Sequence, residues 1–299
     1  MHDDAWVIET ESLTKRYGAL EAVRQLDLRV SAGRITGFLG RNGAGKSTTI
    51  KMLLGISHPT SGTGRLLGHP IDDARQCREA RRHVAYVAED KQTYAYMSVG
   101  QMIAFTRSFY DDWCMDVEAR LLKQYDLPVA RKVKALSKGM RTKLALLLAL
   151  ARRPKLLILD EPSEGLDPVS IEELLQSLVA AAAEGSAVFF SSHQISEVER
   201  IADHVCMLDR GRLVLDASLD AIRRDFRRLE VGFAHEPPHV DWPATDVGSV
   251  RSTGRLVSIL AKRNVDAMIE RAYGAGAVSV ESSAVSLREV FLDQAAERT

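Results

Sequence analysis

The chain has 299 residues, which is enough for one large domain or two smaller ones, and 45% of them are hydrophobic, as in an ordered globular protein. Its 40 basic residues equal its 40 acidic residues, and this zero net charge argues against a protein that coats nucleic acid, so no nucleic-acid partner is expected. The longest apolar runs, 144–151 and 178–183, are too short to span a bilayer.

The N-terminal residues and the cysteines favour an intracellular protein. The first residues, Met1 to Asp4, are acidic and lack the basic and apolar regions of a signal peptide. Cys77, Cys114 and Cys206 are scattered and show no metal-ligand spacing. Cys206 lies in an apolar run, so we expect a small buried residue there. The sequence therefore predicts a soluble protein in a reducing compartment.

The N-terminal part reads as a series of strands. Residues 6–8 and 26–30 alternate as strands do, and 31–33 form a turn before the buried strand expected over 35–39. Tyr17 lies between the first two strands. It is a candidate for stacking on an adenine ring, and the alternative is an ordinary aromatic residue at a strand end.

A glycine-rich loop follows the strand at 35–39 and precedes a predicted helix over 49–54. The loop has the pattern G-x-x-x-x-G-K-S, in which the glycines let backbone N–H groups converge on anionic oxygens. The helix dipole adds favourable potential for phosphate. Lys46 is predicted to reach the β- and γ-phosphates, and Ser47 to bind Mg²⁺. The loop residues are Gly40, Arg41, Asn42, Gly43, Ala44, Gly45, Lys46, Ser47 and Thr48.

The middle of the chain turns from strands to helices. A turn at 59–64 is followed by a predicted buried strand over 84–88, which ends at Glu89. From 98 to 150 the apolar spacing is helical, and Ser137 is predicted to cap the helix that begins after it.

Two carboxylates end the apolar run at 156–159. Such a run predicts a central parallel strand. Asp160 at its mouth is placed to hold Mg²⁺, and Glu161 to orient or deprotonate an attacking water. His193 ends the next predicted strand and is placed to sense the γ-phosphate. The alternatives are two solvated acids and a structural histidine.

The last part of the chain has a different character. After a predicted helix over 169–183 and a hairpin over 205–215, short strands and helices alternate without a catalytic constellation. We expect an accessory α+β domain over 218–299. Its predicted strands are 229–233, 256–261 and 277–281, and its predicted helices are 265–273 and 287–296.

Taken together, these stretches resemble the ATP-binding-cassette (ABC) ATPase family over residues 6–216, in the family's motif order. The resemblance implies an α/β P-loop NTPase core over 1–217 with antiparallel β and helical subdomains, the helical one at about 90–150. It implies catalytic roles for Glu161, His193 and Lys46, and metal ligation by Ser47, Asp160 and Glu89. Further nucleotide contacts are implied at Tyr17, Gly40 to Thr48, Glu89, Leu136, Ser137, Lys138, Gly139, Met140 and Asp167.

Three positions depart from the family pattern. Glu89 stands where the coupling loop usually has Gln. In the family's signature, which the resemblance places at Leu136 to Met140, Lys138 and Met140 replace Gly and Gln. Lys138 could add positive charge near the γ-phosphate, and we favour the alternative that it faces solvent. Arg41 stands where proline is common, which should matter little because the loop backbone binds the phosphates.

The resemblance implies an Mg²⁺-dependent ATPase that powers transport through ATP-driven dimerisation. The variant of the signature in this sequence looks like that of exporter ATPases, so the transport is expected to be export. Its partners would be a separate transmembrane permease and a second identical or related ATPase, on the inner face of the cell membrane. The region 98–136, preceded by Tyr94, Tyr96 and Met97, is the expected docking surface, although the two tyrosines are expected to be partly buried in the core.

Two alternatives are a soluble ABC ATPase that acts on ribosomes or DNA and a non-hydrolysing nucleotide sensor. Ribosome-acting members usually carry two cassettes, and DNA-repair members have long coiled-coil insertions that this sequence lacks. A sensor is disfavoured because Glu161 and His193 are both present.

Overall fold

The structure is a computed structural model that describes residues 6–91, 93–243 and 245–296. The chain divides into two compact units, Met1–Asp216 and Ala217–Thr299, which are described separately below. The expectation about a signal peptide rests on residues 1–4, which lie outside the described residues.

A six-stranded sheet forms the centre of the first unit. Its order is β10-β9-β3-β8-β7-β6, and β3 pairs in parallel with β8 and β9, as β7 does with β6 and β8. Every residue of β7 and β8 is buried, as expected for parallel strands covered on both faces. The strands are β3 (Ile35–Leu39), β6 (Val84–Val87), β7 (Leu156–Leu159), β8 (Ala187–Ser192), β9 (His204–Asp209) and β10 (Arg212–Ser218).

A second, antiparallel sheet has the order β2-β1-β4-β5. Its strands are β1 (Trp6–Tyr17), β2 (Leu20–Ser31), β4 (Ser61–Leu66) and β5 (His69–Pro70). The apolar side chains of this sheet and of α1 (Lys46–Leu53) share a core with the central sheet, where the rings of Phe38 and Phe189 lie 5.2 Å apart. This packing fixes the phosphate loop between β3 and α1.

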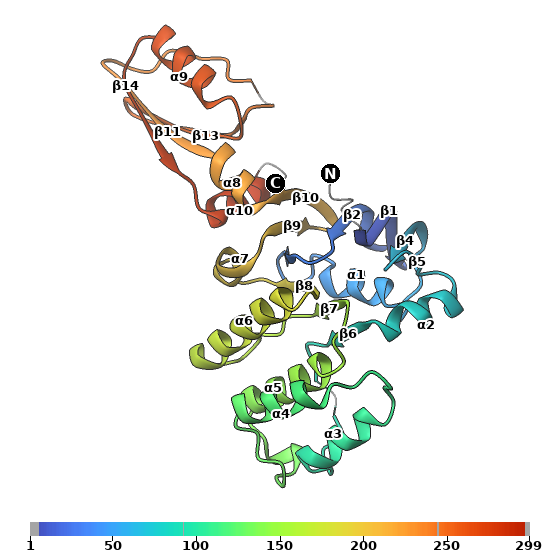
Figure 1. Ribbon diagram of the computed structural model, residues 1–299. Coiled ribbons are helices and arrows are strands. Elements are labelled where there is room, and N and C mark those ends of the chain that lie inside the picture. Colours follow the sequence, from blue (N-terminus) through green and yellow to red (C-terminus); the bar gives the residue numbers. More distant parts are fainter. Residues whose placement is uncertain (1–5, 92, 244, 297–299) are drawn as a thin grey trace. The chain divides into compact units, whose positions relative to one another are not determined.

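Helices α3 (Val99–Arg107), α4 (Met115–Gln124) and α5 (Lys138–Leu150) form a separate cluster in the first unit (Figure 1). The helical pattern predicted over 98–150 therefore consists of three helices and a 3₁₀ turn, Val133–Ala135. Ser98 begins α3 with a capping box, and the Ser137 hydroxyl accepts a hydrogen bond from the Met140 N–H at the start of α5. The predicted role of Ser137 as a cap is confirmed.

The sequence led us to expect that the aromatic residues before α3 are partly buried in the core, and this expectation is wrong. Tyr94 and Tyr96 are 47% and 66% exposed. Their rings contact each other at 5.9 Å, and Tyr94 contacts Phe105 at 5.3 Å. The side chains pack on one another at the surface, which is why they contribute little to the core.

Three further helices complete the described part of the first unit, and two of them had no counterpart in the sequence prediction. Helix α6 (Pro168–Ala183) follows β7 and begins at its N-cap Asp167. The additional helices are α2 (Ala74–Arg82) and α7 (Ile195–Ile201). Among the described residues, no helix has both the length and the hydrophobicity that a membrane crossing requires.

The second unit is an antiparallel sheet of order β12-β13-β11-β14 with three helices. Side chains of β11, β13 and α9, among them Leu229, Ile259 and Met268, form its own core. The sequence prediction missed β12 and α8. The elements are α8 (Leu219–Asp225), β11 (Arg227–Phe233), β12 (Val247–Thr253), β13 (Leu256–Ala261), α9 (Val265–Gly274), β14 (Ala277–Ala284) and α10 (Leu287–Ala296).

Candidate nucleotide-binding site

The glycine-rich loop joins the end of β3 to the first turn of α1. Gly43 and Gly45 have positive φ angles of 81° and 110°, which favour glycine. A Cβ atom at Gly45 would lie 2.4 Å from the Ala22 carbonyl oxygen, so the loop also needs glycine there for space. The loop curls directly into the N-terminus of α1, an arrangement that suits phosphate.

Lys46 is buried beneath this loop. Its ammonium donates hydrogen bonds to the carbonyl oxygens of Gly40 at 2.6 Å and Arg41 at 3.3 Å. It also forms an ion pair with Glu161, whose Oε1 lies 2.9 Å from Nζ. Three oxygens therefore fix the position of the ammonium group at the floor of the loop.

Asp160 lies at the end of β7, beside the loop. Its Oδ1 accepts hydrogen bonds from the hydroxyls of Ser47 at 3.1 Å and Ser191 at 2.7 Å. A hydroxyl and a carboxylate side by side are hard oxygen donors of the kind that Mg²⁺ prefers. These residues fit the ion, which when bound would neutralise charge on phosphate oxygens.

Glu161 is held on both sides. Its Oε2 lies 2.9 Å from Nδ1 of His193 and accepts a hydrogen bond from the His193 N–H, while its Oε1 faces Lys46. Its φ angle of 44° is in the left-handed region, and its N–H donates to the Ser191 hydroxyl at 2.9 Å. The structure therefore brings together the three residues for which catalytic roles were predicted.

A pocket of about 480 Å³ connects these groups with the predicted adenine platform. Tyr17, which is 50% exposed, lines it, and the Lys15 ammonium lies 5.0 Å from the centre of its ring. Glu89 also lines the pocket. Burial, together with the negative charges of Asp160 and Glu89, raises the pKa of Tyr86 to about 12. The predicted adenine, phosphate and coupling-loop positions thus share one cavity.

The signature residues are not among those that line this pocket. Leu136 is buried, whereas Ser137 is exposed at the N-terminus of α5. A Cβ atom at Gly139 would lie 2.8 Å from the Ser170 hydroxyl and 3.9 Å from Oδ2 of Asp167. Asp167 therefore lies near the signature of its own chain, and its side chain caps α6 through the Ser170 N–H.

Lys138 is exposed, in agreement with the favoured prediction that it faces solvent. Its side chain lies against Gly165 of the loop that follows β7. Burial lowers the pKa of Lys91, and the positive charge of the neighbouring Lys138 lowers it further. Met140 is partly buried, and only its N–H is used in the cap.

One functional candidate has no signal in the sequence motifs. Glu197 of α7 is buried and accepts hydrogen bonds from the hydroxyls of Ser163 at 2.8 Å and Ser192 at 3.0 Å. These serines lie two residues after Glu161 and directly before His193. Burial raises the pKa of the Glu197 carboxyl. Glu197 thus ties together the two loops that carry Glu161, the predicted base, and His193, the predicted γ-phosphate sensor.

The parallel sheet, the phosphate loop and the carboxylates at the mouth of β7 define a P-loop nucleoside triphosphatase. The family model described as ABC transporter matches residues 23–164. The chain belongs to the ABC transporter family, as an ATP-binding and ATP-hydrolysing protein.

The relatives support this membership. The chain is 35% identical over 225 residues to the bacitracin transport ATP-binding protein BcrA of Bacillus licheniformis. The matched region covers 74% of this chain and 73% of that protein. It is 35% identical over 224 residues to the Nod factor export ATP-binding protein I of Burkholderia orbicola, covering 72% of each. A solved ATP-binding subunit of an ABC transporter superposes with a TM-score of 0.66 and 30% identity, over 73% of this chain and 92% of that one.

Proposed function

We propose that the chain powers export through a separate membrane-spanning partner by closing as a dimer around ATP. The observation that carries this proposal is the position of Ser137. Its hydroxyl and the first turn of α5 are exposed, and they are not part of the pocket that holds Lys46 and Glu161. A second chain would supply its signature to the phosphates, and each ATP would then join two chains.

In this dimer the residues of one chain hold the nucleotide. Tyr17 stacks on the base, the loop N–H groups and Lys46 bind the phosphates, and Ser47 and Asp160 hold Mg²⁺, with Glu89 close by. Glu161 accepts a proton from the attacking water, and His193 orients the Glu161 carboxylate. The partner chain's signature adds charge-assisted hydrogen bonds, each of about 1.5–3 kcal/mol.

The export direction is supported by the names of relatives, which include a bacitracin transport and a Nod factor export protein. For the membrane partner we propose docking on the exposed aromatic residues of the helical cluster. Tyr94, Tyr96 and Phe109 are 47%, 66% and 65% exposed, and Phe105 contacts both Tyr94 and Phe109. Such contiguous exposed rings are typical of protein interaction sites. The chain would then lie on the cytoplasmic face of the membrane.

The test is expression of the tagged chain in its source organism and isolation, in detergent, of its complex with an integral membrane protein. We expect the two proteins to elute together, and the double variant Tyr96→Ser/Phe109→Ser to lose this association while it still binds ATP. The matched control Val250→Ser changes an exposed apolar residue of the second unit and should elute as wild type does. Co-sedimentation with ribosomes in place of membrane association would overturn the proposal.

A further inference from the structure

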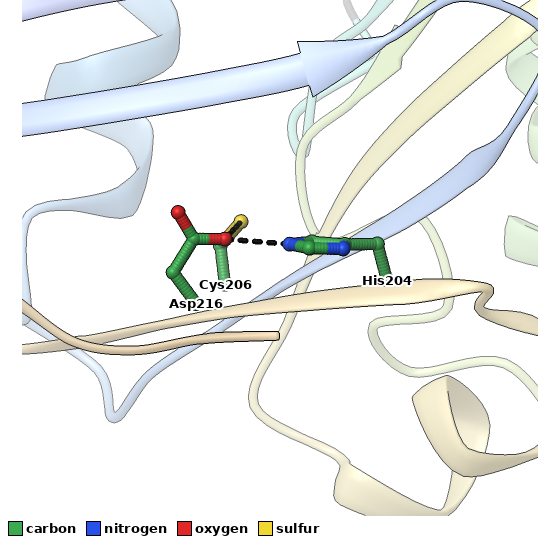
Figure 2. A group of neighbouring side chains, drawn as sticks. All are labelled: His204, Cys206 and Asp216. Carbon is green, nitrogen blue, oxygen red and sulfur yellow. Dashed lines mark hydrogen bonds and ion pairs between the residues drawn. The ribbon is translucent and has the colours of Figure 1, made fainter. Parts of the chain in front are cut away.

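Three side chains of the kinds that can ligate a metal ion converge at one end of β9 and β10, within the first unit (Figure 2). His204 and Cys206 are two residues apart on β9, so their side chains point to the same face of the strand. Asp216 reaches them from the neighbouring strand β10. Figure 2 shows the imidazole, the thiol and the carboxylate turned toward one another.

The distances between the donor atoms are close to those of a coordination site. The carboxylate oxygen Oδ1 of Asp216 lies 2.5 Å from Nε2 of His204 and 3.5 Å from Sγ of Cys206, and one donor atom from each residue lies within 4.8 Å of the others. With metal bonds of about 2.0–2.3 Å, ligand atoms of a tetrahedral site lie about 3.3–3.8 Å apart. The contact between the carboxylate and the imidazole must open by about 1 Å, and the donor atoms of the imidazole and the thiol, which lie within 4.8 Å of each other, must come to the same spacing.

The exposure of the three residues permits this opening. Cys206 is fully buried and fixed in the core, whereas the side chains of His204 and Asp216 are 26% and 38% exposed. A cation can therefore approach from the side of Asp216, whose carboxylate is the least enclosed of the three ligands. A water molecule on the same side would complete four-fold coordination.

We propose that His204, Cys206 and Asp216 form a binding site for a borderline-soft divalent cation such as Zn²⁺. The cation would replace the Sγ proton, which is released to solvent, and the imidazole would keep its proton on Nδ1 so that Nε2 is the ligand. A thiolate and an imidazole select Zn²⁺ over Mg²⁺, because Mg²⁺ prefers oxygen ligands. The site is therefore chemically distinct from the oxygen donors at Ser47 and Asp160.

Cobalt is the probe for this site, because Co²⁺ takes the same ligands as Zn²⁺ and its bond to a thiolate absorbs in the near ultraviolet. We would titrate Co²⁺ into tag-free, reduced, chelator-treated protein. We expect a sulfur-to-cobalt charge-transfer band that saturates at one ion per chain and disappears when Zn²⁺ is added. Wild-type protein without this band would overturn the proposal and leave a hydrogen-bonded histidine–aspartate pair.

Variants assign the band to this cluster. Cys206→Ser should abolish it, and His204→Gln and Asp216→Asn should each weaken Co²⁺ binding by more than about tenfold. The matched control Cys77→Ser removes the other buried thiol and should leave the band unchanged. A band that persists in Cys206→Ser, or that is unaffected by both other changes, would contradict the site.

A second measurement does not depend on absorption. Zn²⁺ that binds only the folded chain must raise the midpoint of thermal unfolding. We expect this shift in wild type and in Cys77→Ser, and its loss in Cys206→Ser, with ATP binding as the check that each variant is folded. The same shift in all three proteins would place the ion elsewhere and overturn the proposal.

Discussion

The Lys46 ammonium and the Glu161 carboxylate form an ion pair of 2.9 Å in which both side chains are almost completely buried, at 5% and 8% exposure. The residues are far apart in the sequence, and they meet because β3 and β7 end at the same edge of the sheet. Removal of one partner of such a pair leaves a buried charge uncompensated. The predicted phosphate ligand and the predicted base are therefore coupled, since phosphate oxygens compete with Glu161 for the ammonium group.

Lys46→Ala should lose ATP binding. The change removes the charge-assisted hydrogen bonds to phosphate, so we expect the affinity to fall by more than about tenfold in an equilibrium binding assay with a fluorescent ATP analogue. Lys51→Ala is the matched control, because Lys51 is an exposed lysine in the last turn of the same helix. An affinity of Lys46→Ala within a few-fold of wild type would refute the assignment.

Glu161→Gln should separate hydrolysis from binding. The amide cannot accept the proton of the attacking water, and we expect hydrolysis to be slower by about 10²–10⁴-fold. Lys46 loses a competing carboxylate, so ATP should bind at least as tightly as it does to wild type. Phosphate release and analogue binding measure the two effects. Wild-type turnover by this variant would rule out Glu161 as the base.

Substitutions of Ser137 distinguish its role as a helix cap from its proposed contact with the partner chain's ATP. Asn and Asp both cap helices about as well as Ser, so Ser137→Asn and Ser137→Asp should unfold at nearly the wild-type temperature. The added carboxylate of Ser137→Asp repels the γ-phosphate, and we expect this variant alone to lose ATP-dependent dimerisation. Dimers of Ser137→Asp as stable as those of Ser137→Asn would contradict the contact.

Glu197 should make stability depend on pH. Burial raises the pKa of this carboxyl above its value in the unfolded chain, so the folded state retains a proton that the unfolded state has lost. The free energy of unfolding should therefore fall as pH rises from about 4.5, where an ordinary glutamate titrates, through the folded pKa. Glu197→Gln lacks this loss, and its stability relative to wild type should increase over that range in denaturant titrations.

The control for Glu197 is an exposed acid of the same unit. Glu172→Gln removes a carboxylate whose hydrogen bond to Arg200 lowers its pKa. Wild type therefore gains stability as pH rises toward 4.5, and the stability of Glu172→Gln relative to wild type should decrease with rising pH, opposite to that of Glu197→Gln. A pH profile of Glu197→Gln that is parallel to wild type would contradict the protonation of Glu197 in the folded state.

The sequence predicted the centre of the fold well because its signals are local. The run that became β7 is entirely apolar, and those that became β3 and β8 combine apolar residues with only Thr, Gly or Ser, as is typical of strands buried on both faces. The phosphate loop is likewise encoded in consecutive residues. Short helices gave no comparable signal: α7 has seven residues, and α2 is rich in arginine and buries only Cys77 and Ala80.

Contacts between distant residues were beyond the sequence argument. Glu197 is one of two acids on a short helix, and nothing in its neighbourhood indicates that Ser163 and Ser192 will donate to it. The grouping of His204, Cys206 and Asp216 was equally hidden, because it depends on which strand lies beside β9. The exposure of Tyr96 was mispredicted because rings that contact one another at the surface resemble core residues in sequence.

The most direct test of ATP-driven dimerisation is the mass of the Glu161→Gln variant in solution, measured by light scattering with and without Mg-ATP. The account predicts a monomer without nucleotide and a dimer with it, since slow hydrolysis preserves the joined state. A particle that stays monomeric at saturating Mg-ATP would contradict the account.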